Sequence, residues 1–444
     1  MPKSSQEDHL NEEIVKSDRL RRLAKEGAWI VVGQIASAIG SLVLVRVLTE
    51  YLDPFKYGQL ALALTLGVLV CQVSMSGVMP GIMRFYTIAV EKGDFQGYTY
   101  ASRMMMVYGT LVTIAIGVLL LTFAFISGHK SWLGLLATAI ILTQISSYNA
   151  TLSSIQNAAR QRAVVAFHNA IDPWFRIGMS TGMFVLFGRT PLSALFGYTV
   201  AALVLLASQW FFFLRLSNGI SKSNQSGSTQ WVKQFIEYSR PFMIFNMFTW
   251  AQSNSDRWSL QTFSSTHTVG QFSVLMQLGY APISIFMNLL SNFISPILNQ
   301  RAGDASDQAR LKSVHSISAI ITLLCLGATL VIFLATMLLH EQIFQVFVAS
   351  EYRNSSHLLP WILLAGGVMS AGEMLSLKLM SDLNTRALLW PKLITAIVGI
   401  CLNYAGAYYY DLQGVVAAAV VISLISLLWL AVLMRKSAGS YKVA

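Results

Sequence analysis

Residues 413–434 read QGVVAAAVVISLISLLWLAVLM, a run of 22 residues without a charged side chain. An α-helix rises about 1.5 Å per residue, so this stretch is long enough to cross the hydrocarbon core of a bilayer, which is about 30 Å thick. A helix also pairs its backbone polar groups within itself, as hydrocarbon requires. The stretch therefore predicts a transmembrane helix.

The overall composition extends this interpretation to the whole chain. Of 444 residues, 55% are hydrophobic and only 11% are charged, whereas roughly 25% of the residues in an ordinary soluble domain are charged. So few charges cannot cover the surface of the two or three soluble domains that a chain of this length would form. The composition predicts an all-α integral membrane protein and excludes most classes of soluble enzyme.

Apolar segments long enough to cross a bilayer recur along the chain. We predict about 12 transmembrane helices in two groups of six, separated by the polar stretch SNGISKSNQSGSTQWVKQ. The predicted spans are 27–48, 58–78, 103–126, 131–152, 164–187, 191–214, 235–262, 268–295, 313–338, 358–380, 388–409 and 413–434. The predicted domains are a cytoplasmic tail (1–26), an N-terminal six-helix lobe (27–216), a cytoplasmic linker (217–234), a C-terminal six-helix lobe (235–434) and a second cytoplasmic tail (435–444).

The net charge of +11 indicates membrane topology rather than a nucleic-acid partner. With the N-terminus inside, the predicted cytoplasmic tails and loops receive 24 of the 31 Lys and Arg residues and the outer loops receive 5, while Arg46 and Arg176 fall within spans. Cytoplasmic loops of membrane proteins are enriched in basic residues. The asymmetry predicts that both termini are cytoplasmic, and it removes the nucleic-acid interpretation.

The first connector of each half carries a similar pattern. Arg46 precedes Gly58 by 12 residues, Arg257 precedes Gly270 by 13, and each of these glycines is followed by glutamine. Both halves run in the same direction, as expected for repeats related by an axis along the membrane normal. The pattern is short, and its position in each half is what favours an internal repeat.

The order of several motifs points to a known family. These motifs are Ala28, Gly33 and Gly40, then RVLTEYLDPFKYGQLALA at residues 46–63 with Gly77 after it, then Pro241, Asp256-Arg257 and Val269-Gly270-Gln271. With them, essentially the whole chain resembles the lipid-linked O-antigen repeat-unit flippases, which are polysaccharide exporters of the multidrug/oligosaccharidyl-lipid/polysaccharide superfamily.

The resemblance implies a fold, an activity and partners. The implied fold is two six-helix lobes around a central cavity. The implied activity is translocation of an undecaprenyl-diphosphate-linked oligosaccharide, a repeat unit of O-antigen or another surface polysaccharide, across the bacterial inner membrane. Translocation would proceed by alternating access and be driven by a cation such as a proton. A polysaccharide polymerase and a chain-length regulator are the expected protein partners, and no cofactor is expected.

Moving a glycan through hydrocarbon requires a polar and cationic cavity, because each unsatisfied polar group there costs several kcal/mol. Polar side chains recur at helical spacing in the first, fifth, seventh and eighth predicted spans. The residues that we expect to line the cavity are Arg46, Arg176, Arg257, Gln34, Asn246 and Asn288. A structural interpretation stays open, because polar residues also hold transmembrane helices together and because Arg46 and Arg257 lie near the outer interface, where they can act as anchors.

Two acidic residues within spans are the candidates for ion coupling. A charge at the centre of a transmembrane helix costs at least ~2.5–3.5 kcal/mol, so it is seldom kept without a purpose. Asp172 lies four residues before Arg176, and the two can form a salt bridge that is either structural or functional. Glu373 has no obvious partner at helical spacing, which makes it the second candidate.

Other functions fit the sequence less well. The chain has no phosphate loop of the type GxxxxGK[ST], so ATP hydrolysis is not expected. His168 and Asp172 match the HxxxD pattern of some acyltransferases, but so short a pattern does not support catalysis. The three cysteines are far apart and predict no metal site. We therefore predict a transporter and not an enzyme, with a multidrug or small-solute carrier as the alternative, because a fold alone does not choose the substrate.

Overall fold

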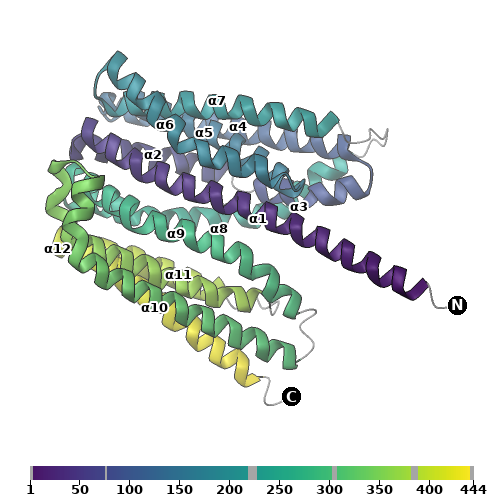
Figure 1. Cartoon of the computed structure of the whole chain (residues 1–444). Coiled ribbons are helices and arrows are strands. Elements are labelled where there is room, and N and C mark those ends of the chain that lie inside the picture. The colour runs from purple at the N-terminus through teal and green to yellow at the C-terminus, as the bar shows by residue number, and fades with distance from the viewer. Residues whose placement is uncertain (1–3, 76–77, 219–227, 303–307, 382–388, 441–444) are drawn as a thin grey trace.

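The computed structural model describes residues 4–75, 78–218, 228–302, 308–381 and 389–440. Within these ranges the regular structure is entirely helical, and the helices form two bundles that lie side by side (Figure 1). Both termini emerge at the same end of the molecule, which we call the terminal end; the opposite end is called the closed end. The predicted all-α architecture with two lobes is confirmed.

The N-terminal lobe contains seven α-helices within the described residues. They are α1 (Ser4–Tyr51), α2 (Pro54–Met75), α3 (Val78–Glu91), α4 (Phe95–Ile126), α5 (Leu133–Ala158), α6 (Arg162–Phe187) and α7 (Pro191–Asn218), with the short 3-10 helix η1 (Lys130–Trp132) before α5. The predicted N-terminal tail is part of α1, because that helix already begins at Ser4.

The C-terminal lobe repeats the helical pattern. Its elements are α8 (Ser228–Phe263), α9 (Thr266–Ala302), α10 (Gln308–Phe347), the 3-10 helix η2 (Ser350–Leu358), α11 (Leu359–Ser381) and α12 (Leu389–Ser440). The last of these is two helices joined at a kink, where Tyr410 and Asp411 leave the helical conformation and Asp411 has a φ of 52°.

Nine stretches of the described residues are long and apolar enough to cross a membrane. The last of them, Lys392–Met434, runs across the kink at Asp411 and so corresponds to two of the predicted spans. Helices α6 and α8 correspond to the predicted spans 164–187 and 235–262 but are not among the nine. These two helices carry Arg176 and Arg257, which are residues of the candidate site described below.

Close packing of α1 on α6 depends on two glycines. A Cβ atom at Gly33 would lie 2.8 Å from the carbonyl oxygen of Ala166, and one at Gly40 would lie 2.9 Å from Nε1 of Trp174. Small residues let transmembrane helices approach closely. Helix α6 runs unbroken through Pro173, and its residues Ala166 and Trp174 pack on α1.

The buried apolar side chains show where the two lobes are joined. One core contains residues of both lobes, including Leu48 and Leu60 from α1 and α2 and Phe272 and Tyr352 from α9 and η2. Toward the terminal end, the described part of the chain forms separate clusters, one built mainly by the N-terminal lobe and two by the C-terminal lobe. The lobes are therefore joined at the closed end and have separate cores toward the termini.

The beginning of α8 packs on the N-terminal lobe. Trp231 and Phe235 are buried in the core of that lobe, and Nε1 of Trp231 donates to Oδ2 of Asp94 at 2.7 Å. Asp94 also caps α4 by accepting the backbone N–H of Gly97 at 3.0 Å. Residues 228–234 of the predicted linker are thus helical, and residues 219–227 of it lie outside the described ranges.

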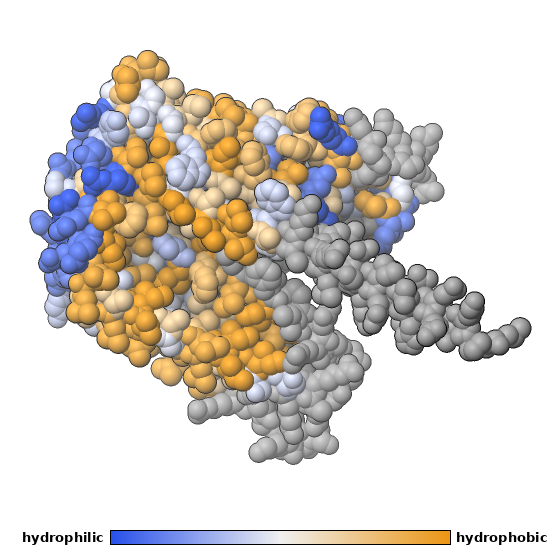
Figure 2. All heavy atoms as spheres, viewed as in Figure 1, coloured by the Kyte–Doolittle hydropathy of each residue, from blue (hydrophilic) through white to orange (hydrophobic). Residues whose placement is uncertain are grey.

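The sides of the molecule expose large apolar side chains. Leu119, Val185 and Leu338 are 69%, 77% and 81% exposed, and Figure 2 shows hydrophobic residues over the flanks of both lobes, with hydrophilic residues gathered at the closed end. Monomeric soluble proteins rarely expose contiguous apolar patches of this extent. The chain is a multi-pass membrane protein.

Candidate functional site

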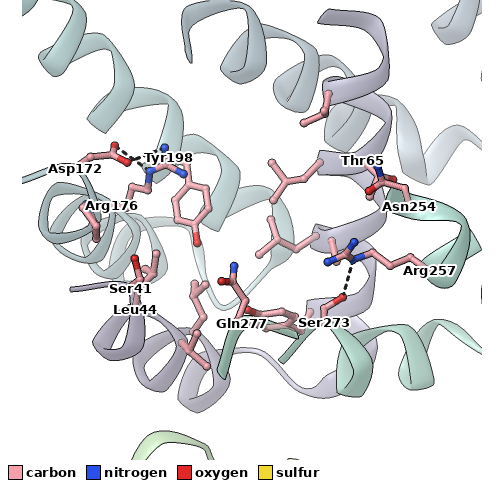
Figure 3. A pocket seen from close by; sticks show the side chains of 18 residues that line it. Ser41, Leu44, Thr65, Asp172, Arg176, Tyr198, Asn254, Arg257, Ser273 and Gln277 are labelled. Atoms are coloured by element: carbon pink, nitrogen blue, oxygen red, sulfur yellow. Dashed lines mark hydrogen bonds and ion pairs between the residues drawn. The ribbon is translucent and has the colours of Figure 1, made fainter. Parts of the chain in front are cut away.

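A cavity of about 330 Å³ lies between the two lobes, and we call it the interlobe cavity. Its lining comes from α1, α2, α6 and α7 of the N-terminal lobe and from α8 and α9 of the C-terminal lobe. Leu48, Tyr57 and Leu60 of the joined core form part of its wall. Figure 3 shows Arg176 on one side of this cavity and Arg257 on the other, so each lobe supplies one guanidinium group.

The Arg176 side chain is held by a bidentate ion pair on its own helix. Its Nε donates to Oδ1 of Asp172 at 3.0 Å, and its Nη2 lies 2.9 Å from Oδ2 of the same carboxylate. The guanidinium also lies over the ring of Tyr198, 5.2 Å from the ring centroid. Nη1 of Arg176 has no hydrogen-bond partner among the described residues, so its two N–H groups remain for a ligand. The predicted salt bridge is confirmed.

The Arg257 side chain is less completely neutralised. Its Nε donates to Oγ of Ser273 at 3.4 Å, and its Nη1 is 3.8 Å from Oδ1 of Asp256. That carboxylate oxygen also accepts the backbone N–H of Arg257 at 2.7 Å. Asp256 does not line the interlobe cavity, whereas Arg257 does. Arg257 therefore presents a positive charge to the interlobe cavity, and the carboxylate of Asp256, which partly offsets this charge, does not line the cavity.

The charge of the lining favours an anion. Two guanidinium groups face the interlobe cavity against the single carboxylate of Asp172. Arginine presents planar pairs of N–H groups that match phosphate oxygens, and such an interaction is stronger in a medium of low dielectric than in water. The remaining polar lining is neutral and comes from Ser41, Thr65, Tyr57, Tyr198, Asn254, Ser273 and Gln277. No group of three or more His, Cys, Asp or Glu side chains that could hold a metal occurs in the part of the chain that the structure describes.

A second cavity, of about 390 Å³, lies within the N-terminal lobe, and we call it the N-lobe cavity. Gln34, which the sequence places in the transport path, lines this cavity and not the one between the lobes. Asp172 and Arg176 line both cavities. The ion pair on α6 therefore lies where the two cavities meet.

Two predicted cavity residues, Arg46 and Asn246, line neither cavity, and a third, Asn288, has a side chain that the structure does not describe. Arg46 lies at the closed end, where its Nη1 donates to the carbonyl oxygen of Val348 at 2.6 Å and its Nη2 lies 3.1 Å from Oε2 of Glu50. Asn246 is half-buried on α8 and lines neither cavity. The side chain of Asn288 lies outside the described part of the structure. In this conformation Arg46 thus joins the lobes instead of facing the transport path.

Glu373 lies on α11 in the C-terminal lobe, away from both cavities. Lys392 is within electrostatic reach of its carboxyl group, and Tyr280 is within reach of both Glu373 and Asp256. Lys392 is 19 residues further along the chain, so spacing along one helix could not identify it as a neighbour. The two candidates for ion coupling, Asp172 and Glu373, are therefore in different lobes.

Several residues of the interlobe cavity were not predicted from the sequence. Tyr198 lies in the predicted span 191–214, which contains no charged residue, and only the packing of α7 on α6 brings its ring beneath Arg176. Asn254 could have been found, because it precedes Arg257 by three residues and so lies on the same helical face. Ser273 carries no such signal, since its contact with Arg257 is made between two helices.

Comparisons with known proteins agree with this architecture. A family model described as polysaccharide biosynthesis protein matches residues 23–301. An inward-facing multidrug resistance MATE family transporter of the MOP superfamily superposes with a TM-score of 0.70 at 13% identity, over 92% of this chain and 96% of the other. The lipid II flippase MurJ, in an inward closed conformation, gives 0.66 at 15% identity, over 91% and 87%.

An outward-facing MATE family transporter of the same superfamily gives a lower TM-score of 0.54, at 14% identity over 94% of this chain and 97% of the other. No curated protein sequence gives a significant match. At these identities the likeness to solved structures concerns the fold alone, whereas the family model concerns the sequence.

Proposed function

Because the chain belongs to the polysaccharide biosynthesis protein family and has the fold of membrane flippases and transporters, we propose that it translocates a lipid-linked oligosaccharide across a membrane. The substrate in this proposal is an undecaprenyl-diphosphate-linked repeat unit of O-antigen or another surface polysaccharide. The chain is a transporter and not an enzyme, so the glycan crosses without chemical change.

One observation carries the proposal: Arg176 from one lobe and Arg257 from the other face the same cavity. A diphosphate is an anion with oxygens suited to guanidinium groups, and the neutral hydroxyl and amide groups of the lining suit the sugar attached to it. The prenyl tail would stay in the bilayer, along the apolar flanks that Figure 2 shows.

The way the lobes are joined supports transport by alternating access. A substrate would enter from the terminal end, bind between the arginines and leave after the lobes separate at the closed end. The better superposition on an inward-facing transporter than on an outward-facing one supports cytoplasmic termini, as does the distribution of basic residues. The membrane would then be the bacterial inner membrane, where a polysaccharide polymerase and a chain-length regulator would act on the product.

Coupling to a cation, such as a proton, completes the proposal. Asp172 shares its ion pair with a cavity-lining arginine, so a change in its protonation would release Arg176 for the diphosphate. Glu373 is the second candidate, in the other lobe.

The proposal is tested by replacing the two arginines in a strain whose surface polysaccharide depends on this chain. We expect Arg176→Ala, Arg176→Gln and Arg257→Gln to insert normally and to lower translocation at least about tenfold, the cost of one charge-assisted hydrogen bond. Arg353→Gln is the matched control, because Arg353 is exposed at the closed end and lines neither cavity.

Two results would count against the proposed function. One is a normal amount of surface polysaccharide in the Arg176 and Arg257 variants. The other is export of cationic drugs that depends on the chain while polysaccharide export does not, which would favour the multidrug alternative.

A further inference from the structure

The N-lobe cavity is polar but almost uncharged. Its lining comes mainly from α1, α5, α6 and α7, and among the described residues its acidic and basic groups, apart from a histidine, are Asp172 and Arg176, which pair with each other. The histidine, His168, has both ring nitrogens engaged: Nδ1 is 2.7 Å from the carbonyl oxygen of Val164 and Nε2 is 3.0 Å from Oγ of Ser208. The cavity therefore has little net charge with which to select an ion.

Many of its neutral polar groups have no partner. In the described part of the chain, no hydrogen bond is made by the side chains of Gln34, Ser37, Ser146, Ser153 and Asn169, all of which line this cavity. In a membrane protein, polar groups without a partner are costly, and they are normally satisfied by protein, water or ligand. Three of the four lobe helices that form the cavity contribute at least one of these groups.

The α5 part of the wall, which carries Ser146 and Ser153, is fixed to α7 by two hydrogen bonds. Nδ2 of Asn149 donates to the carbonyl oxygen of Ala202 at 2.9 Å, and one heptad further on Nε2 of Gln156 donates to that of Gln209 at 3.3 Å. These two bonds tie α5 to α7. The position of the α5 hydroxyl groups is thus set before any ligand binds, which lowers the entropy cost of binding.

This chemistry selects among classes of ligand. An apolar drug would leave the amide and hydroxyl groups unpaired, and a metal ion would need several acidic, histidine or cysteine ligands that do not gather in the described residues. A neutral sugar presents hydroxyl groups around its whole ring and can pair with donors and acceptors on several sides. The volume of about 390 Å³ is within the range of ordinary small-molecule pockets.

We propose that the N-lobe cavity is a subsite for neutral sugar residues of the substrate, separate from the diphosphate site between Arg176 and Arg257 in the interlobe cavity. The inference rests on the proposed function and divides its substrate between two places. The Asp172–Arg176 pair, which lines both cavities, marks the boundary between these two places. The cavity would thus determine which oligosaccharides are carried, and the interlobe cavity would hold the head group common to all of them.

Binding to the purified full-length chain in nanodiscs tests this division. The probes are inorganic pyrophosphate and a panel of neutral disaccharides (N,N′-diacetylchitobiose, lactose and maltose), followed by calorimetry and by saturation-transfer NMR. We expect at least one disaccharide to bind saturably, and we expect the double variant Gln34→Leu/Asn169→Leu to weaken it about tenfold or more while pyrophosphate binding is unchanged. We expect Arg257→Gln to weaken pyrophosphate binding and to leave disaccharide binding unchanged.

Two further variants test whether a loss of binding comes from a folding defect. Ser37→Ala/Ser153→Ala removes two hydroxyl groups with little change of volume and should also weaken the disaccharide. Gln96→Leu makes the same kind of exchange at an exposed position outside both cavities and should change neither probe.

The possible failures are distinguishable. Either of two results would overturn the subsite and leave the proposed function standing. In the first, both double variants bind the disaccharide as well as the wild type does. In the second, no disaccharide binds although pyrophosphate binds and transport is normal. If the wild-type chain bound neither probe and carried no lipid-linked oligosaccharide, both would be overturned.

Discussion

Gly58 of α2 and Gly270 of α9 meet backbone to backbone where the two lobes are joined. A Cβ atom at Gly58 would collide with the carbonyl oxygen of Thr266, and a Cβ atom at Gly270 would collide with that of Pro54. The two glycines occupy corresponding positions of the Arg-to-Gly pattern found in each half of the sequence. The same residue type is thus placed on both sides of the contact, and any larger side chain there would force the lobes apart.

We expect Gly58→Ala to open the closed end. The added methyl group must separate α2 from α9, and overpacking of this kind typically costs about 1–3 kcal/mol. A cysteine introduced at Leu48, which is 2% exposed and lines the interlobe cavity, would report the opening by reacting faster with a thiol reagent that does not cross membranes. The background needs Cys401→Ser, because Cys401 is exposed.

Gly327→Ala serves as the control for this experiment, because a Cβ atom at Gly327 would meet nothing within 4 Å. Equal reaction rates at position 48 in the Gly58→Ala and Gly327→Ala proteins would show that the glycine contact does not hold the lobes together.

The hydroxyl group of Tyr352 is expected to stabilise the contact between the lobes at the closed end. Its Oη donates to the carbonyl oxygen of Leu52 at 2.7 Å across the two lobes, and both residues are buried. Tyr352→Phe keeps the packing and leaves that carbonyl without its donor, so we expect the free energy of unfolding to fall by about 1–2 kcal/mol. Thermal unfolding in detergent measures the change. Tyr409→Phe, at a position that is 72% exposed, should have no such effect, and an equal effect of the two would refute the assignment.

Proton coupling should depend more on Asp172 than on Glu373. Asp172 lines both cavities, whereas Glu373 lines neither. We therefore expect Asp172→Asn to remove the dependence of translocation on a proton gradient in proteoliposomes, and Glu373→Gln to reduce it less. Glu91→Gln, at an exposed position, is the control. If transport remained proton-coupled in both Asp172→Asn and Glu373→Gln, neither carboxyl group would be the coupling site.

Asp53, in the connector between α1 and α2, should make stability depend on pH. Burial tends to raise the pKa of Asp53, but the backbone N–H of Lys56 at 2.9 Å from Oδ1 and its ammonium group at 3.1 Å from Oδ2 outweigh this, so the pKa lies below its usual value. A lowered pKa in the folded state means that the carboxylate stabilises the fold above its unfolded pKa of about 3.9, and that this contribution is lost as the pH falls through the folded value.

Asp53→Asn keeps the hydrogen-bonding shape and removes the charge. Because the pair is about 40% exposed, solvent screens it, and we expect a loss of only about 0.5 kcal/mol at pH 7 that is smaller at pH 3, which lies below the unfolded pKa of about 3.9. Comparing thermal unfolding of the variant and the wild type at the two pH values measures this. A difference of the same size at both would mean that the charge of Asp53 is not responsible.

Much of the candidate site was predictable because its signal lies within single helices. Asp172 and Arg176 are four residues apart, so their salt bridge followed from helical spacing alone. Arg257 and Gln34 belong to sets of polar residues at helical spacing in their predicted spans, and both line cavities. In this conformation Arg46 donates to the carbonyl oxygen of Val348, and helical spacing could not predict this partner because it is 302 positions away in the chain.

The sequence by itself determined that this chain lies in a membrane as two bundles of helices. That conclusion depends on local quantities, namely the length of apolar runs and the scarcity of charge, which act whatever the helices pack against. Only the tertiary structure decided that Gln34 and Arg257 line different cavities and that Gly58 meets Gly270. Those relationships arise from contacts between helices distant in sequence, and the periodicity of one helix carries no information about the partner it will meet.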